Sequence, residues 1–288
     1  MNFDKPITDI IQQRFSCRNY LETPLDAARQ QTLLDFLAPL RTGPLGTPLR
    51  FDLVAATQQD REALKGLGTY GFIKGECGFL VGAVQHAEKD LEDFGYVMEQ
   101  AVLKATDLGL GTCWLGGSFT RSSFARNITA TENEQIPAVA SIGYIEDLEQ
   151  ARNNFIRLQV RGNQRLPWEQ LFFQQKFGAA LSHAEAGEYA VTLEMVRWGP
   201  SASNKQPWRI VRDNHTWHFY MQRTKGYRDN LFSKVMSIAD LQRVDLGIAL
   251  CHFELTARQQ GIQGQWRIQE PDIARPDDLC EYTVSWVS

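Results

Sequence analysis

The chain has 288 residues, of which 43% are hydrophobic and 22% charged, so we expect a globular protein that buries its core in one or two units. It shows no apolar run of membrane-spanning length and no basic segment followed by an apolar stretch, which predicts a cytoplasmic protein without a membrane role. A formal net charge of −4 argues against a broad nucleic-acid surface, and five cysteines without a C-x-x-C pair, together with scattered histidines, argue against a disulfide framework or a metal site.

The N-terminal segment predicts a short helix followed by an anion-binding stretch. Residues 7–13 have an amphipathic pattern, and Arg14, Ser16 and Arg18 then alternate along an extended segment. Alternate residues of an extended chain point to one side, so two guanidinium groups and a hydroxyl would converge on a phosphate or another anion. A pair of solvated arginines is the simpler alternative.

Runs of β-branched and aromatic residues predict the strands of both halves, and a helical apolar period predicts one long helix in each. Residues 147–167 are polar and are expected to connect the halves. The first half has a turn at 43–49, a strand at 80–84, a helix at 93–109, a strand carrying Trp114 and a strand at 138–144. The second half has a helix at 189–198, a turn at 199–208, strands at 210–211 and 217–221, a helix at 245–261, a strand carrying Trp266 and a strand at 282–287.

The turn at 199–208 holds more polar groups than a connection needs. Ser201, Ser203 and Asn204 offer hydroxyl and amide groups, and Pro200 and Pro207 stiffen the loop that carries them. Such a loop suits recognition of a ring edge or a phosphate. The alternative is a well-capped turn whose side chains satisfy their own backbone.

The two long helices belong to an internal repeat with a constant offset of 152 residues. Background composition would give about one or two identities over this stretch, and the alignment has six. A long period used twice predicts two fused copies of one α/β unit, with boundaries at 1–150 and 168–288 and a connector at 151–167. The identical pairs are Asp93/Asp245, Gly95/Gly247, Leu103/Leu255, Ala105/Ala257, Gly109/Gly261 and Trp114/Trp266.

The polar motifs differ between the two copies. The first copy carries the R-x-S-x-R motif and the second does not, whereas the first copy has Gly43 to Leu49 where the second has Gly199 to Trp208. Each copy has therefore lost what the other retains, which predicts one composite site and one inactive counterpart.

Three segments together resemble the FMN-dependent nitroreductase superfamily. They are R-x-S-x-R at 14–18, L-G-L-G-T-C-W at 108–114 and P-S-A-S-N-K-Q-P-W at 200–208. The resemblance covers nearly the whole chain and implies an α+β protein made of two fused nitroreductase folds. Each would be an α/β/α sandwich with a mainly antiparallel sheet, and together they would form an intramolecular pseudo-dimer that can be monomeric.

The resemblance also implies one FMN site shared between the repeats. Arg14 and Ser16 would hold the phosphate or the ribityl chain, Arg18 would lie near the pyrimidine edge, and the glycine turn would bring a backbone N–H to N5. Phe15 departs from the basic residue common at its position, and Arg165 is a better match than Arg161 for a late phosphate ligand. The implied cofactor-binding residues are Arg14, Phe15, Ser16, Arg18, Leu110, Gly111, Thr112, Pro200, Ser201, Ser203, Asn204, Arg165 and Arg161.

The implied chemistry is hydride transfer from NAD(P)H through flavin N5 to a small acceptor such as a nitroaromatic compound or a quinone. It needs no catalytic side chain, and the sequence shows no nucleophile constellation. Two alternatives stay open: other flavin chemistry on the same scaffold, such as dehalogenation or flavin breakdown, and a flavin-free binding protein whose sites have both decayed.

Four further residues allow two interpretations each. Cys113 is either a redox thiol beside the glycine turn or a small apolar packing residue, and the second is the commoner fate of such a cysteine. Tyr70, Phe72 and Trp208 either form an aromatic wall for planar acceptors or pack in the core.

Overall fold

The computed structural model describes most of the chain. The described residues are 2–54, 57, 73–75, 78–117, 119, 121–149, 164–227 and 239–288. No helix among them is long and apolar enough to span a membrane.

The first half is built on a sheet whose strands pair antiparallel, in the order β1-β2-β5-β3, with β4 beside β2. Predicted and observed strands agree closely, since 80–84 lies within β2 and 138–144 overlaps β5. The elements are α1 (Ile7–Gln13), α2 (Ala27–Leu37), β1 (Leu49–Val54), β2 (Gly78–Gln85), α4 (Asp90–Asp107), β3 (Gly111–Leu115), α5 (Arg121–Asn127), β4 (Glu134–Gln135) and β5 (Val139–Gly143).

The second half has its own sheet, in the order β6-β7-β8-β10-β9, with β6 parallel to β7 and the other pairs antiparallel. The predicted helices at 189–198 and 245–261 correspond to α9 and α11. The elements are η2 (Trp168–Gln170), β6 (Phe172–Gln174), α8 (His183–Ala186), η3 (Gly187–Tyr189), α9 (Ala190–Arg197), η4 (Ala202–Asn204), β7 (Trp208–Asp213), β8 (Thr216–Gln222), α11 (Leu241–Gln259), β9 (Gln265–Arg267) and β10 (Cys280–Val287).

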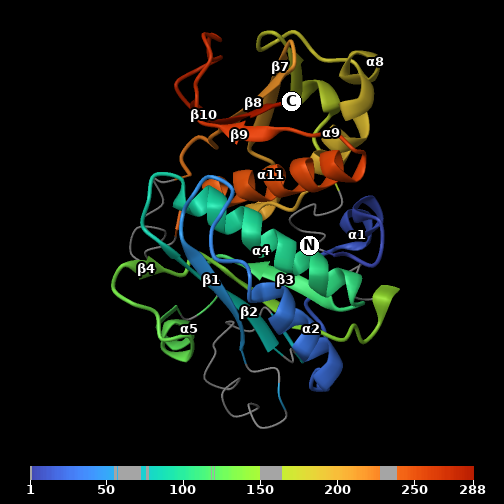
Figure 1. The fold of residues 1–288 in the computed structure, drawn as a ribbon, viewed down its shortest axis with the longest axis vertical. Coiled ribbons are helices and arrows are strands. Elements are labelled where there is room, and N and C mark those ends of the chain that lie inside the picture. Colours follow the sequence, from blue (N-terminus) through green and yellow to red (C-terminus); the bar gives the residue numbers. More distant parts are fainter. Residues whose placement is uncertain are drawn as a thin grey trace.

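The two sheets enclose the pair of long helices, α4 and α11 (Figure 1). Alternate residues of β2 show how the first sheet is covered on both faces. Leu80 and Val84 join the central core that contains α4, whereas Phe79 and Val81 join a second cluster with Phe124 of α5. This α+β arrangement, with mainly antiparallel sheets packed against helices, agrees with the predicted fold class.

The amphipathic pattern assigned to residues 93–109 underestimates the burial of this helix. All residues of α4 are buried, including Glu99, Gln100 and Lys104 on its polar side. The physical reason is that α11 covers the side of α4 that the first sheet does not. The polar side chains of α4 therefore need partners inside the protein.

Two glycines allow α4 and α11 to approach closely. A Cβ atom at Gly95 would lie 2.1 Å from the carbonyl oxygen of Val244, and one at Gly247 would lie 2.0 Å from the carbonyl oxygen of Glu92. The contact is reciprocal, because each glycine meets the residue three positions before the other glycine. This is the pattern expected of a self-complementary interface, and it fits two fused copies.

The repeated aspartates each hold a loop that lies on the N-terminal side of a strand, β1 in the first half and β7 in the second. Asp93 accepts hydrogen bonds from the backbone N–H groups of Leu45 and Thr47, both at 2.7 Å. Asp245 accepts the N–H of Ala202 at 3.0 and 3.1 Å. The pair identified in the alignment therefore has one structural task in both halves, which is to fix the loops at 43–47 and 199–202 against the central helices.

We predict that Gly95→Ala and Gly247→Ala each lower the free energy of unfolding by about 3 kcal/mol, because the added methyl group overlaps backbone atoms that cannot rotate away. Urea unfolding measures the change. Gly178→Ala is the control, since Gly178 has φ +84° but no atom within 4 Å of the added Cβ, and it should cost only about 1 kcal/mol. Equal costs at all three positions would contradict the proposed helix contact.

We also predict a pH-dependent difference between the wild type and Asp245→Asn. Burial raises the pKa of Asp245 well above its usual value, and the Ala202 N–H only partly opposes this shift. The protonated carboxyl stabilises the fold below its unfolded pKa of about 3.9, and this stabilisation is lost as pH rises through the folded pKa. The free energy of unfolding of the wild type, minus that of the variant, should therefore fall from pH 4 upward.

Urea titrations between pH 4 and pH 8 measure this difference. Asp93→Asn should show a change of the same sign, because burial also raises the pKa of Asp93. A difference that grows with pH would show that the buried carboxylate is favoured in the folded protein.

Candidate functional site

The R-x-S-x-R segment packs against the strand that follows the glycine turn. Arg14 ends α1 with extended backbone angles, and Ser16 then forms a parallel bridge with Thr112. The backbone N–H of Cys17 donates to the carbonyl of Thr112 at 2.8 Å. The structure thus brings together residues 14–18 and 110–112, two of the three segments that the sequence assigns to one site.

The turn between α4 and β3 makes this approach possible. Gly109 has φ +79°, its N–H bonds to Thr106 O, and the N–H of Leu110 bonds to Ala105 O, which is the Schellman pattern for a helix end. A Cβ atom on Gly111 would lie 3.0 Å from Cys17, so a larger residue would push the R-x-S-x-R segment away from β3.

Arg14 is buried without enough partners for its guanidinium group. Its Nε lies 3.9 Å from Glu99 Oε1, and Nε and Nη1 have no hydrogen-bond partner among the described residues. Burial lowers the pKa of Arg14 below its usual value, which the Glu99 carboxylate partly opposes. Thr112 Oγ1, on the strand beside Ser16, also lacks a partner within the described part of the chain. Buried donors of this kind are costly unless a ligand completes them.

Glu99 connects Arg14 to the second half of the chain. Its Oε1 lies 2.9 Å from His252 Nε2, and its Oε2 accepts the indole N–H of Trp114 at 2.8 Å. The other imidazole nitrogen, Nδ1, faces the carbonyl of Met195 at 2.8 Å. Both nitrogens of His252 therefore lie within hydrogen-bond distance of an oxygen atom, one from each half of the chain.

Arg14, Glu99 and His252 thus form one cluster of ionisable groups. Both Glu99 and His252 are fully buried, so water does not screen the interactions within this cluster. The sequence interpretation missed both residues, because a glutamate and a histidine within helical apolar patterns look like ordinary polar-face positions. The available signal was their place on the two repeated helices, one turn beyond Gly95 and Gly247.

The loop at 199–208 combines self-satisfied side chains with unusual backbone angles. Ser201 Oγ accepts the N–H of Gln206 at 2.9 Å, and Asn204 Nδ2 donates to Gln164 O at 3.0 Å. The alternative of a turn that satisfies its own backbone is thus correct for part of this loop. Pro200 precedes these residues in the chain. Ser203, Asn204 and Gln206 nevertheless have φ of 50°, 54° and 50°, a left-handed region that costs energy for such residues.

The remaining predicted residues fall in three different places. Arg165 lies beside the loop at 199–208, with Nη2 donating to Trp198 O at 3.1 Å and the guanidinium 5.6 Å from the Trp198 ring. Arg18 Nη1 reaches back to Ser16 O at 3.5 Å, and Phe15 is buried in the cluster beneath β3. Arg161, Tyr70 and Phe72 lie outside the described residues.

Two of the alternatives are decided by burial. Trp208 is fully buried and packs in the central core, so it is not part of an exposed aromatic wall. Cys113 is 1% exposed and packs with apolar neighbours, as the apolar interpretation predicts. Within the described residues, no group of histidine, cysteine and acidic side chains could hold a metal ion.

A comparison of the chain with models of protein families identifies its family. A family model described as "Putative TM nitroreductase" matches residues 6–257. The chain belongs to this nitroreductase family. The resemblance seen in the three motifs is therefore confirmed, and a comparison with curated proteins gave no match.

One solved structure shows the same fold along the whole chain. A nitroreductase structure from Thermotoga maritima is similar to this chain at 20% identity and a TM-score of 0.61, and the match covers 100% of this chain and 95% of that one. A nitroreductase in complex with FMN from Desulfovibrio desulfuricans covers 50% of this chain with 88% of its own, at 18% identity and a TM-score of 0.37. A protein from Parabacteroides distasonis named NADH dehydrogenase/NAD(P)H nitroreductase covers 54% with 96% of its own, at 17% identity and a TM-score of 0.41.

We predict that Glu99→Gln lowers the free energy of unfolding by about 3 kcal/mol, because it leaves Arg14 and His252 without a buried counter-charge. Combining it with Arg14→Met should cost about 2 kcal/mol less than the sum of the single variants, since the two groups share one interaction. Urea unfolding of the four proteins in the cycle measures this coupling.

Glu270→Gln serves as the control for removing an ion pair. Glu270 and Arg275 are both 44% exposed, and loss of such a surface pair should cost less than about 1 kcal/mol. Strict additivity of Glu99→Gln and Arg14→Met would contradict the coupling of the two buried groups.

Proposed function

We propose that this nitroreductase-family protein is an FMN-dependent oxidoreductase with one flavin site shared between its two halves. The observation that carries the proposal is the buried Arg14 guanidinium, whose Nε and Nη1 have no hydrogen-bond partner among the described residues. A positively charged donor buried beside the glycine turn fits an anionic ligand, and the flavin phosphate or the ring system supplies one.

The surrounding residues fit the same ligand. Ser16 and Thr112 lie on adjacent extended segments, and Thr112 Oγ1 has no partner within the described part. The buried guanidinium group of Arg14 favours a bound anion over a neutral molecule of the same shape. Arg18 would add a second cation, and the Gly111 and Thr112 backbone would allow close approach to the ring.

The second half contributes the loop at 199–208. Ser203 and Asn204 hold left-handed backbone angles, and strain of this kind is concentrated at binding sites. Asp245 anchors this loop by accepting the backbone N–H of Ala202. Asp245 lies on α11, the helix that also carries His252. We propose that Pro200, Ser201, Ser203 and Asn204 complete the flavin site, with Arg165 beside them.

Bound FMN would supply hydride chemistry, accepting two electrons from NAD(P)H and passing them to a small electrophilic acceptor such as a nitroaromatic compound or a quinone. The protein residues would bind and orient the cofactor and supply positive charge near it. Dehalogenation or flavin breakdown would use the same residues. A requirement for a halogenated substrate or for oxygen would distinguish these reactions from the proposed one.

We predict that Arg14→Ala, Arg18→Ala and Asn204→Ala each weaken FMN binding by about tenfold to a hundredfold, because each removes a hydrogen bond worth about 1.5 to 3 kcal/mol when charged. Quenching of flavin fluorescence on titration gives the dissociation constants. NADH and NADPH are then tested by bleaching of the bound flavin spectrum.

Arg275→Ala is the matched control, because Arg275 pairs with Glu270 on the surface and should leave FMN binding unchanged. An effect at Arg14 and Arg18 but not at Asn204 would reject the site shared between the halves. A wild-type protein that does not change the spectrum or fluorescence of added FMN would reject the enzyme and favour a flavin-free binding protein.

A further inference from the structure

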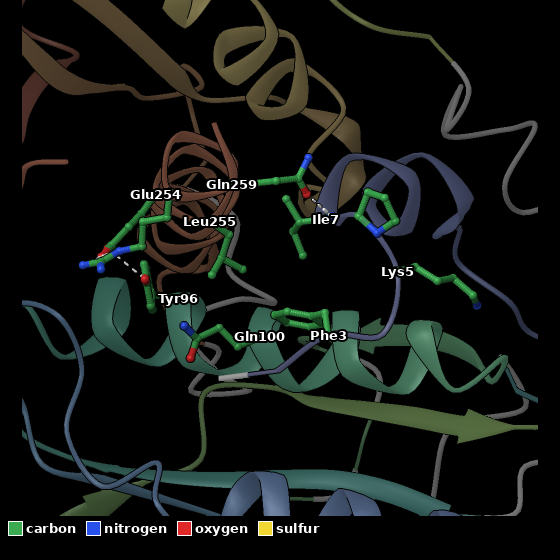
Figure 2. Close-up of a pocket in the computed structure, with 10 residues that line it drawn as sticks. Phe3, Lys5, Ile7, Tyr96, Gln100, Glu254, Leu255 and Gln259 are labelled. Atoms are coloured by element: carbon green, nitrogen blue, oxygen red, sulfur yellow. Dashed lines mark hydrogen bonds and ion pairs between the residues drawn. The ribbon is translucent and has the colours of Figure 1, made fainter. Parts of the chain in front are cut away.

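A cavity of about 870 Å³ lies between the two central helices and the N-terminal segment. Figure 2 shows Tyr96 and Gln100 entering it from α4, Glu254 and Leu255 entering it from α11, and Phe3 closing one side. None of these residues belongs to the proposed flavin site. A volume of this size is typical of small-molecule pockets.

The repeat gives this cavity a counterpart. Gln100 occupies on α4 the position that His252 occupies on α11, at the same offset of 152 residues. The indole N–H of Trp266 donates to Glu254 at 2.6 Å, as that of Trp114 donates to Glu99. The cavity is therefore lined by the repeat equivalent of His252, with an amide in place of the imidazole, whereas the equivalent of Glu99 is Cys251, which does not line it.

The Glu254 carboxylate that lines the cavity is already paired, and the Lys5 ammonium group already has a backbone acceptor. Glu254 accepts hydrogen bonds from Tyr96 at 2.8 Å, from Arg258 at 2.8 Å and from Trp266. Lys5 Nζ donates to the carbonyl of Asp107 at 2.9 Å. An ionic ligand would have to break these pairs, so the lining favours a neutral molecule over an ion.

The amide of Gln100 has an unmet hydrogen-bonding group. Gln100 is 2% exposed, and its Oε1 has no hydrogen-bond partner among the described residues. An amide pairs best with another group that offers both a donor and an acceptor, such as a carboxamide or a ring lactam. The apolar walls beside it, Phe3, Ile7 and Leu255, suit a flat aromatic body.

We propose that this cavity is a second small-molecule site, which takes a neutral planar aromatic carboxamide or lactam held by the Gln100 amide against the Phe3 ring. The site is independent of FMN binding, since its lining residues are not those assigned to the flavin.

Naphthalene-2-carboxamide, titrated into FMN-saturated protein by isothermal calorimetry, tests the proposal. We expect Gln100→Leu to weaken its binding about tenfold, because leucine fills a similar volume without the amide. Phe3→Ala should weaken it by several-fold through loss of the aromatic wall. Bound FMN, measured from its absorbance, should be unchanged in both variants.

Naphthalene-2-carboxylate is the matched ligand, since it keeps the rings but lacks the amide N–H groups, and it should bind more weakly than the carboxamide. Binding of the carboxamide that survives both substitutions would place it outside this cavity and overturn the proposal. Tighter binding of the carboxylate would overturn the assignment of a neutral amide. Loss of FMN binding in the Arg14 variants does not affect this test, so failure of one proposal is distinguishable from failure of the other.

Discussion

The close contact between α4 and α11 is the constraint on which the rest of the structure depends. Gly95 and Gly247 let the helix backbones meet without intervening side chains, and both sheets then pack on the outer sides of the pair. Burial removes water from the polar residues of α4 and from several of those of α11. The Arg14 cluster and the buried Gln100 amide are both consequences, because each holds polar groups that the helix pair has enclosed.

The same packing explains why single residues both stabilise the core and hold the segments proposed to bind the cofactor. Glu99 accepts from Trp114 of its own half and lies 2.9 Å from His252 of the other half, so one carboxylate holds the strand after the glycine turn and joins the two halves. Asp245 likewise fixes a loop with left-handed residues against α11. Displacement of either helix would therefore shift the proposed flavin-binding segments as well as the core.

Much of the fold could be predicted from the sequence, because strands and helix ends leave local signals. Gly109 and Gly261 marked both helix ends, and the alternation at Arg14, Ser16 and Arg18 marked the extended segment beside β3. Glu99 and His252 could not be predicted as partners, since their contact depends on how α11 lies on α4. The burial of Trp208 likewise depends on packing of α11 over β7, which leaves no sign in a ten-residue motif.

The α4–α11 contact also has a consequence for how the protein behaves on dilution. In an assembly of two separate subunits such an interface is lost by mass action when the subunit concentration falls below the dissociation constant. Here both helices belong to one chain, so each faces the other at a high effective concentration that does not depend on how much protein is present. A pair of helices held in this way persists even where a cell contains only a few copies of the protein.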